Sequence, residues 1–336
     1  MQSREAGVDI DRANSVVRGI AGLAKPTWGP AVLSEIGSFG GLFDARALGP
    51  DAVLVASMDG VGTKLAVARL AGRWEGVGED LVNHSVNDIL VQGGRPLFFL
   101  DYVGAGQLER DAVLGMVRGM ARACAAHGCA LLGGETAEMP GTYAKGDYDL
   151  VGCIVGVARR DQLLTGDRVE AGDEVWGLPS TGLHTNGYSL ARRALLDGGD
   201  LDPAAVHPAL GVSVLDALLA VHRPYLEPLW PLVQDRRIHA LAHITGGGFV
   251  DNIPRVLPAG TAVEIDRRAW TVPPIFRLIQ ERSGADDAEM ARVFNLGIGM
   301  IVLLAPGDAP ALAARCPDAK RLGQVVRGDR TVRLHP

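Results

Sequence analysis

Acidic side chains stand beside glycines in the first half of the chain, in a pattern suited to holding a metal ion. The segment DGVGTK (59–64) opens with Asp59 directly after an apolar run, and GGETAEMPG (133–141) carries Glu135 after another. The ends of strands are common ligand sites, so both carboxylates are candidate ligands. Asp88 interrupts an otherwise apolar helical pattern, where an unpaired carboxylate would be costly to bury.

The chemistry that these carboxylates favour is magnesium binding. Asp101, within FFLDY, and Glu138 add to the acidic set, and no Cys/His cluster lies near them. A donor set of oxygens suits a hard cation. Magnesium is usually held by one or two carboxylates together with substrate phosphates, so the pattern predicts ATP as a ligand. Two plainer interpretations stay open: an Asp-Gly pair is an ordinary turn, and single buried acids are often satisfied by a helix cap or an arginine.

Glycines and lysines near these acids could contact the phosphates. SFGGLF (38–43) contains Gly40 and Gly41, whose backbone N–H groups could cradle phosphate oxygens. Lys25 and Lys64 could add positive charge, although a solvated surface position is the alternative for each lysine. The Gly-Thr-Lys end of DGVGTK is not a P-loop, because one residue separates its glycines where that motif needs four.

Glycines also separate an expected strand from an expected helix at ITGGGFVDNIPRVL (244–257). Helix N-termini present unpaired N–H groups, so this segment is a candidate cradle for a phosphate monoester, with a tight strand-to-helix turn as the alternative. The residues concerned are Thr245, Gly246, Gly247 and Gly248.

His184 is the histidine best placed for proton transfer. It lies in STGLHTNGYSLAR (180–192), close to Asn186 and outside any apolar face, and an ordinary histidine pKa suits acid–base chemistry. His243, within LAHIT, is interpreted as a packed or hydrogen-bonded histidine.

Hydrophobic periodicity predicts the elements that must position these residues. In the first half, strands alternate with helices: strands at 53–58, 97–103, 130–132 and 150–157, and helices at 80–92 and 108–127. The second half repeats the alternation, with strands at 174–178, 240–244, 261–265, 298–304 and 321–326, and helices at 188–196, 249–256, 275–282 and 308–315. This order predicts an α/β (α+β) fold. A polar stretch at 159–173 indicates a junction, and we place the boundary between 168 and 169.

Composition limits the possible functions. The 336 residues suit two domains, and 47% hydrophobic residues exclude disorder as the main state. With 33 basic against 39 acidic residues, the net charge of −6 argues against nucleic-acid binding. No apolar run is long enough to span a membrane and the start shows no signal peptide. Four cysteines, none in a C-x-x-C pair, favour reduced buried thiols, and we expect a cytoplasmic protein.

Nine segments together resemble the phosphoribosylformylglycinamidine cyclo-ligase family, also called aminoimidazole ribonucleotide synthetases. The resemblance runs in order from about residue 5 to 327. Its segments are MDGVGTKL (58–65), VNDILVQGG (86–94), PLFFLDY (96–102), GCALLGGETAEMPG (128–141), GDYDLVG (146–152), GLHTNGYSL (182–190), AHITGGGF (242–249), NIPRVLP (252–258) and FNLGIGM (294–300).

The resemblance implies a ligase of de novo purine biosynthesis that converts formylglycinamidine ribonucleotide and ATP to aminoimidazole ribonucleotide. In the family's scheme, ATP phosphorylates the formyl oxygen to give an iminophosphate, which the amidine nitrogen attacks to close the ring. It also implies a homodimer in which amino-terminal sheets pair into a barrel. Residues 1–168 would then bind ATP and dimerise, and 169–336 would form an α/β sandwich completing the substrate site.

Site roles carried over from the family fall on residues already singled out. Asp59, Asp88 and Glu135 would hold magnesium–ATP, with Lys25, Gly40, Gly41 and Lys64 near the phosphates. Asp59 would also count among the catalytic residues, with His184 and Asn186 facing the formamide. Thr245 and Gly246, Gly247 and Gly248 would hold the ribose phosphate.

The chain departs from the family pattern at three places. PTWGP (26–30) stands in place of a basic stretch. VHRPYLEP (221–228) stands where a Pro-Thr-Arg-Ile-Tyr run is common, keeping Arg223 and Tyr225 but changing their neighbours. Leu296 stands where Cys is usual, which excludes a catalytic thiol there.

Two alternative functions stay open. One is another ATP user of the same superfamily: a thiamine-phosphate kinase, a selenophosphate synthetase or a hydrogenase-maturation dehydratase. The last two would need a reactive amino-terminal Cys or Sec, or a carboxyl-terminal Cys, and the chain ends RTVRLHP. The other alternative is a nucleotide-binding module without turnover.

Overall fold

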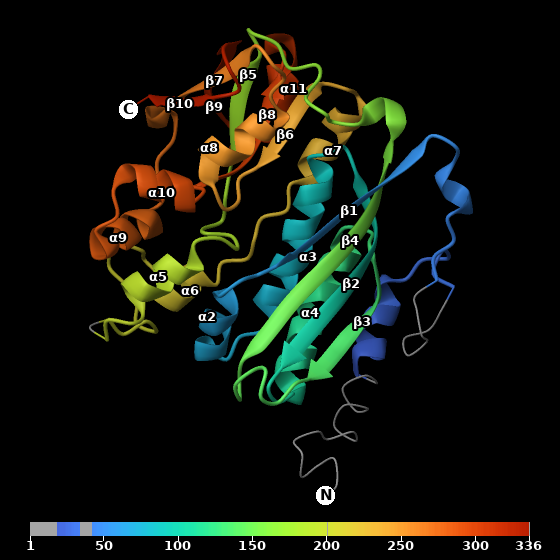
Figure 1. Ribbon diagram of the computed structural model, residues 1–336, viewed down its shortest axis with the longest axis vertical. Coiled ribbons are helices and arrows are strands. Elements are labelled where there is room, and N and C mark those ends of the chain that lie inside the picture. The colour runs from blue at the N-terminus through green and yellow to red at the C-terminus, as the bar shows by residue number, and fades with distance from the viewer. Residues whose placement is uncertain (1–18, 34–41, 200, 336) are drawn as a thin grey trace, which may run out of the picture. The chain divides into compact units, whose positions relative to one another are not determined.

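The structure, a computed structural model, describes residues 19–33, 42–199 and 201–335 (Figure 1). It divides into two compact units. The first comprises Met1–Ile89 and Arg95–Ala158, and the second comprises Leu90–Gly94 and Arg159–Pro336. Each unit combines helices with a sheet that contains both parallel and antiparallel strand pairs, which confirms the predicted mixed α/β class.

The first unit is built on a four-stranded sheet in the order β1-β4-β2-β3, in which β2 runs parallel to β3 and antiparallel to β4. Helices α3 and α4 pack against one face of it (Figure 1). Its elements are η1 (Lys25–Thr27), η2 (Arg46–Leu48), β1 (Ala52–Gly60), α2 (Lys64–Ala71), α3 (Glu75–Leu90), β2 (Arg95–Ala105), α4 (Arg110–Ala126), β3 (Ala130–Glu138) and β4 (Tyr148–Arg159).

Glycines allow α3 and α4 to approach closely. A Cβ atom at Gly119 would lie 1.9 Å from the carbonyl oxygen of Glu75, and one at Gly78 would lie 2.0 Å from that of Met116. Side chains at either position would force the helices apart, because packed cores do not absorb such overlaps. The close contact fixes α3, the helix that carries Asp88.

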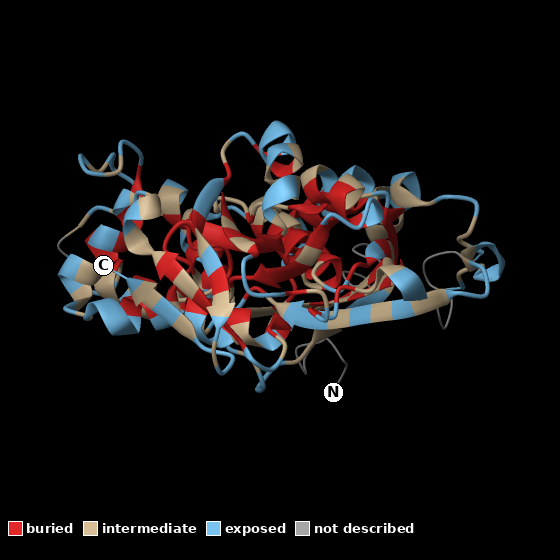
Figure 2. Ribbon diagram, turned by 90° about the horizontal axis from the view of Figure 1, so that it is seen from above, coloured by how far each residue is buried: buried red, intermediate tan, exposed pale blue. Residues whose placement is uncertain are grey.

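The two faces of this sheet are buried to different degrees. On β2, Phe99 and Val103 are buried, whereas Phe98 and Leu100 on the opposite face are only partly so. Figure 2 shows exposed and intermediate residues alternating along a strand at the lower edge of the view. In this unit, Leu54 on the edge strand β1 is 63% exposed. One face of the sheet is therefore apolar and only partly covered, and we call it the half-open apolar face.

The structure corrects one predicted strand end. GGETAEMPG was expected to follow a strand at 130–132, but β3 continues through Glu138. Gly134 is a strand residue opposite Asp101, and a Cβ atom there would lie 2.5 Å from the Asp101 Oδ1 atom. This glycine therefore makes room for a neighbouring carboxyl group, and no turn is present at that point.

The second unit is built on a six-stranded sheet in the order β10-β7-β9-β5-β8-β6. Every residue of β8 is buried, so this strand is covered on both faces. The elements are η3 (Arg160–Gln162), β5 (Glu174–Pro179), α5 (Tyr188–Leu195), α6 (Val214–Leu218), α7 (Leu226–Gln234), β6 (Ile238–His243), α8 (Gly248–Asn252), η4 (Ile253–Val256), β7 (Thr261–Asp266), η5 (Arg267–Ala269), α9 (Pro274–Ser283), α10 (Asp287–Val293), β8 (Ile298–Leu304), η6 (Pro306–Asp308), α11 (Ala309–Arg315), β9 (Lys320–Arg327) and β10 (Val332–His335).

All predicted strands and helices of the second unit are present, with ends that differ by a few residues. The helix predicted at 249–256 is split between α8 and η4. Helices α6, α7 and α10 and strand β10 were not predicted. Helix α7 contains Pro231, which hides its helical pattern in the sequence.

The cysteines are unpaired, and three of the four are buried; Cys153 is partly exposed. Among the described residues, every helix is too short or too polar to cross a membrane.

Candidate functional site

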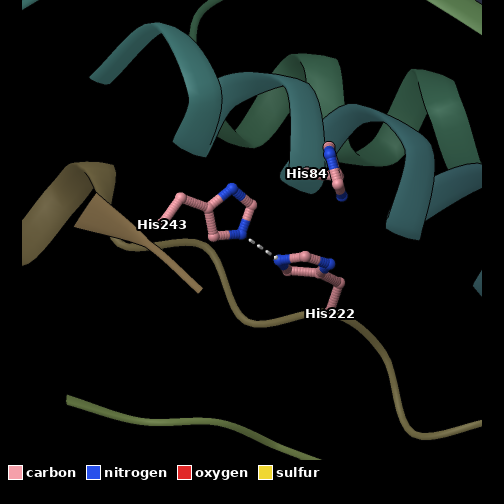
Figure 3. A group of neighbouring side chains, drawn as sticks. All are labelled: His84, His222 and His243. Carbon is pink, nitrogen blue, oxygen red and sulfur yellow. Dashed lines mark hydrogen bonds between the residues drawn. The ribbon is translucent and has the colours of Figure 1, made fainter. Parts of the chain in front are cut away.

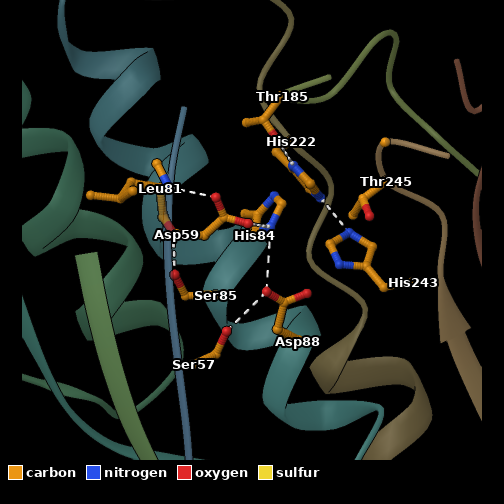
Figure 4. A network of polar contacts seen from close by, with 12 residues as sticks. Ser57, Asp59, Leu81, His84, Ser85, Asp88, Thr185, His222, His243 and Thr245 are labelled. Carbon is orange, nitrogen blue, oxygen red and sulfur yellow. Dashed lines mark hydrogen bonds and ion pairs between the residues drawn. The ribbon is translucent and has the colours of Figure 1, made fainter. Parts of the chain in front are cut away.

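Two carboxylates and one imidazole converge in the first unit. His84 Nε2 lies 2.8 Å from Asp59 Oδ2 and 3.4 Å from Asp88 Oδ2. Figure 4 shows these three side chains pointing toward one another from β1 and α3. One ligand atom from each residue fits within a span of 4.8 Å, which is compatible with a shared metal ion. The structure thus brings Asp59 and Asp88 together.

Local structure sets this geometry. Asp59 lies at the end of β1, where the N–H group of Gly60 donates to its Oδ1 atom over 2.7 Å. His84 and Asp88 are four residues apart on α3 and therefore share one face of the helix. Ser57, two residues before Asp59 on β1, donates to Asp88 Oδ2 over 3.1 Å. Strand and helix are therefore joined by hydrogen bonds at the site itself.

The charges of the group are linked. Burial disfavours the charged form of His84, but the hydrogen bonds and charges of Asp59 and Asp88 outweigh it and raise the pKa of His84 to about 9. Burial also opposes ionisation of Asp59, yet the hydrogen bond and the charge of His84, together with the Gly60 N–H group, outweigh it and lower the pKa of the carboxyl group. The side chain of Asp59 is 49% exposed and that of His84 only 4%. The group therefore has a buried cation behind an accessible carboxylate.

Glu135, the third predicted metal ligand, lies elsewhere in the first unit. It is an exposed residue of β3, and β3 and β1 are opposite edges of the four-stranded sheet. Asp101 is also separate: it is buried, and desolvation raises the pKa of its carboxyl group to about 7.

The predicted phosphate-contacting residues have different surroundings. The Lys64 side chain is fully buried, and its Nζ atom lies 2.6 Å from Asp80 Oδ2, which is buried as well. Its ammonium group is therefore held by an ion pair in the core. Lys25 is exposed on η1, which is anchored to β3 because Trp28 Nε1 donates to the Leu131 carbonyl over 2.8 Å. Gly40 and Gly41 lie outside the described residues.

In the second unit, His184 is buried, although its neighbours in the sequence are glycines and polar residues. It is 1% exposed and adopts a left-handed backbone conformation, with φ of 62°. Its Nε2 atom accepts a hydrogen bond from the Thr181 N–H group over 3.3 Å. This acceptor role fixes a neutral ring with its proton on Nδ1.

His243 is hydrogen-bonded, as predicted. Its Nε2 atom lies 3.0 Å from Nε2 of His222, a fully buried residue of the loop before α7 (Figure 3). The ring of His222 in turn stacks on that of His184, with 3.8 Å between ring centroids. Three histidines of the second unit thus form one continuous cluster.

Thr245, Gly246 and Gly247 lie in the loop between β6 and α8, and Gly248 is the first residue of α8. Asn252 Nδ2 donates to the Gly248 carbonyl over 2.8 Å and braces the loop. A Cβ atom at Gly248 would lie 1.9 Å from the Ala291 carbonyl oxygen, so packing requires that glycine. Gly246 is different: the nearest atom to its missing Cβ is Asn186 Oδ1, at 3.3 Å. The structure therefore brings Asn186 and Gly246, both predicted substrate residues, side by side.

Sequence reasoning missed two residues of these clusters, His84 and His222. His84 could have been found, because it stands four residues before Asp88 on the same apolar helix. His222 has no such local signal, since its partners are distant in sequence.

The raised pKa of His84 predicts how stability changes with pH. The folded state holds this proton more tightly than the unfolded chain, whose value is near 6.5. The proton on His84 therefore stabilises the folded state fully below about pH 6.5, and this stabilisation is lost as pH rises through about 9. Urea denaturation of metal-free protein should show a stability advantage of the wild type over His84→Gln that shrinks across this range. A difference in unfolding free energy between the two proteins that stays constant with pH would contradict the raised pKa of His84.

Comparisons with known proteins cover both units. Residues 41–158 match the family described as AIR synthase related protein, N-terminal domain, and residues 170–335 match its C-terminal domain. Among solved structures, thiamine-monophosphate kinase from Stenotrophomonas maltophilia has a TM-score of 0.67 at 21% identity, covering 97% of this chain and 95% of that one. Hydrogenase maturation protein HypE in complex with ATP also has a TM-score of 0.67, at 19% identity, covering 96% and 90%. These likenesses establish the fold.

Sequence relatives are much more similar. The phosphoribosylformylglycinamidine cyclo-ligase of Xanthomonas oryzae pv. oryzae is 47% identical over 99% of this chain and 100% of that protein. The enzyme of the same name from Burkholderia vietnamiensis is 47% identical over 98% of this chain and 92% of its own length. Such identity across both units shows that the chain belongs to the phosphoribosylformylglycinamidine cyclo-ligase family.

Proposed function

We propose that this protein closes the imidazole ring of aminoimidazole ribonucleotide, using ATP and formylglycinamidine ribonucleotide, in purine biosynthesis. The observation that carries the proposal is the 47% identity to named cyclo-ligases over 99% of the chain. The chemistry of this reaction also explains why ATP is required. An amide oxygen is a poor leaving group, and phosphorylation by ATP lets it depart as phosphate when the amidine nitrogen attacks the same carbon. Residues 1–168 would bind ATP, and 169–336 would bind the ribonucleotide.

Asp59 and Asp88 would hold the magnesium ion that accompanies ATP. Their oxygens are the donors that magnesium prefers, and Asp59 is half exposed, which leaves room for water and phosphate ligands. When bound, magnesium neutralises charge on the transferring phosphoryl group. His84 already donates to both carboxylates, so the ion would compete with the His84 proton for the same oxygens.

Lys25 and Lys64 stay predicted phosphate contacts. For Lys64 this contact requires its ammonium group to leave Asp80, so we favour Lys25, which is exposed on η1.

The ribonucleotide would bind through the two loops that meet at Asn186 and Gly246. Asn186 Nδ2 is a buried donor without a hydrogen-bond partner among the described residues, and it would gain one from a substrate oxygen. The loop from Thr245 to Gly248 would take the ribose phosphate. His184, neutral and held by backbone N–H groups, would orient the formamide rather than act as a mobile base.

We further propose that two copies pair their amino-terminal sheets into a barrel. The support is the half-open apolar face of the first unit, on which Leu54 and Met58 are 63% and 70% exposed. Patches of this kind usually mark an interface. Three strand spacings, about 14 Å, separate β1 from β3. Glu135 would therefore reach the magnesium–ATP held by Asp59 only where the edge strands of two copies meet.

One assay tests the function and the role of Asp59. Purified protein with ATP, magnesium and formylglycinamidine ribonucleotide should release ADP and aminoimidazole ribonucleotide. Asp59→Asn should reduce turnover by about a hundredfold or more, because it removes a charged oxygen ligand. Asp51→Asn, at an exposed carboxylate before β1, is the matched control and should keep wild-type turnover. ADP release that needs thiamine monophosphate, or ATP binding without turnover, would refute the proposal.

The barrel predicts a specific change in oligomeric state. Leu54→Arg should convert the dimer to a monomer in sedimentation velocity, because it places a charge on the apolar sheet face. Leu70→Arg introduces the same charge at another exposed leucine, on α2, and should leave the dimer intact. A wild-type monomer, or equal behaviour of the two variants, would rule out this interface.

A further inference from the structure

A chain of contacts between three buried rings links two loops of the second unit. His184 belongs to the loop after β5, His243 ends β6, and His222 lies between them in space on the loop that precedes α7. His222 is fully buried, whereas His184 and His243 are 1% and 6% exposed. Figure 3 shows a nitrogen atom of His222 and one of His243 facing each other, and the two ring planes are inclined at 61°.

His222 contacts its two neighbours in different ways. Its ring lies nearly parallel to that of His184, with 21° between the planes and 3.8 Å between centroids. Toward His243 it makes the 3.0 Å contact between Nε2 atoms, and its Nδ1 atom lies 3.5 Å from Thr185 Oγ1 (Figure 4). The same side chain therefore stacks on His184, makes a polar contact with Thr185 in the same loop, and forms a hydrogen bond to His243.

The contact between Nε2 atoms restricts where protons can lie. One of the two nitrogens must donate and the other must accept, so only one of them carries a proton. Two imidazolium rings would place both N–H groups against each other, so the pair holds at most one positive charge. The tautomer of His243 is thereby coupled to that of His222, and the hydrogen bond holds the two rings in a defined orientation.

The segment that carries His222 is itself firmly held. Arg223 Nη1 donates to the Pro179 carbonyl over 3.2 Å and lies 2.6 Å from Asp318 Oδ2. The Tyr225 hydroxyl group donates to the same carbonyl over 2.9 Å. These contacts hold the segment on both sides of Pro224.

We propose that His222 is a positioning residue, which joins the loop of His184 and Asn186 to the loop of His243 and Gly246. It acts by stacking on His184 and by setting the tautomer of His243. Since those loops are the ones assigned to the ribonucleotide, the effect on turnover rests on the proposed function, whereas the effect on His243 does not.

Two variants separate the stacking from the hydrogen bond. His222→Phe keeps an aromatic ring of similar size but cannot bond to His243, whereas His222→Gln can still do so. His239→Gln is the control, because His239 pairs with Asp173 at 2.7 Å and lies outside the cluster. Thermal denaturation identifies any variant that does not fold. The variant that does fold then tests the role of His222.

The first readout is the tautomer of His243, observed by nitrogen-15 NMR of histidine-labelled protein. We expect His222→Phe to shift the His243 ring signals, and His222→Gln and His239→Gln to leave them close to the wild type. Unchanged His243 signals in His222→Phe would overturn the proposal, whether or not the protein is a cyclo-ligase.

The second readout is the ring-closure assay. His222→Phe should lower kcat/KM for the ribonucleotide by about 10- to 100-fold, by analogy with the loss seen when a partner that orients a metal-binding histidine is removed. The KM for ATP should change little, and His222→Gln should recover most of the loss. Equal activity of His222→Phe and wild type would overturn the coupling to turnover. An inactive wild type would refute the proposed function instead, and the NMR result would then decide the role of His222.

Discussion

Two carboxylates held against one nitrogen atom need a cation between them, and the first unit is organised around this requirement. Asp59 and Asp88 come from a strand and a helix, and the buried ring of His84 contacts both. Two negatively charged carboxylates that both contact one nitrogen atom would repel each other strongly in a partly desolvated site. The His84 proton supplies the positive charge in the metal-free protein, and we propose that magnesium supplies it when ATP is bound.

The surrounding structure serves to keep these groups together. Gly78 and Gly119 let α3 and α4 pack closely, which holds His84 and Asp88 in place. The hydrogen bond from Ser57 then fastens α3 to β1. In the second unit, three histidines have a comparable role: His222 stacks on His184 and is hydrogen-bonded to His243, which holds the three rings together. One unit thus presents charge for a cation, and the other presents oriented rings and amides.

Much of this could be predicted from the sequence, because it depends on local patterns. Apolar periodicity predicted α4 nearly to its ends. The Asp-Gly pair pointed to Asp59 as a candidate ligand, and the glycine-rich segment pointed to the residues from Thr245 to Gly248. Burial and long-range pairing could not be predicted in this way. Lys64 and His184 have polar, glycine-rich neighbours in the sequence, yet both side chains are enclosed. The continuation of β3 through Glu138 depends on pairing with β2, which no local pattern reveals.

The most direct test of the central claim is the number of protons released when magnesium–ATP binds. Titration calorimetry at about pH 8, in two buffers of different ionisation enthalpy, measures this number. If magnesium replaces the His84 proton at Asp59 and Asp88, the wild type should release about one proton more than His84→Gln. Equal proton release by the two proteins would contradict the account.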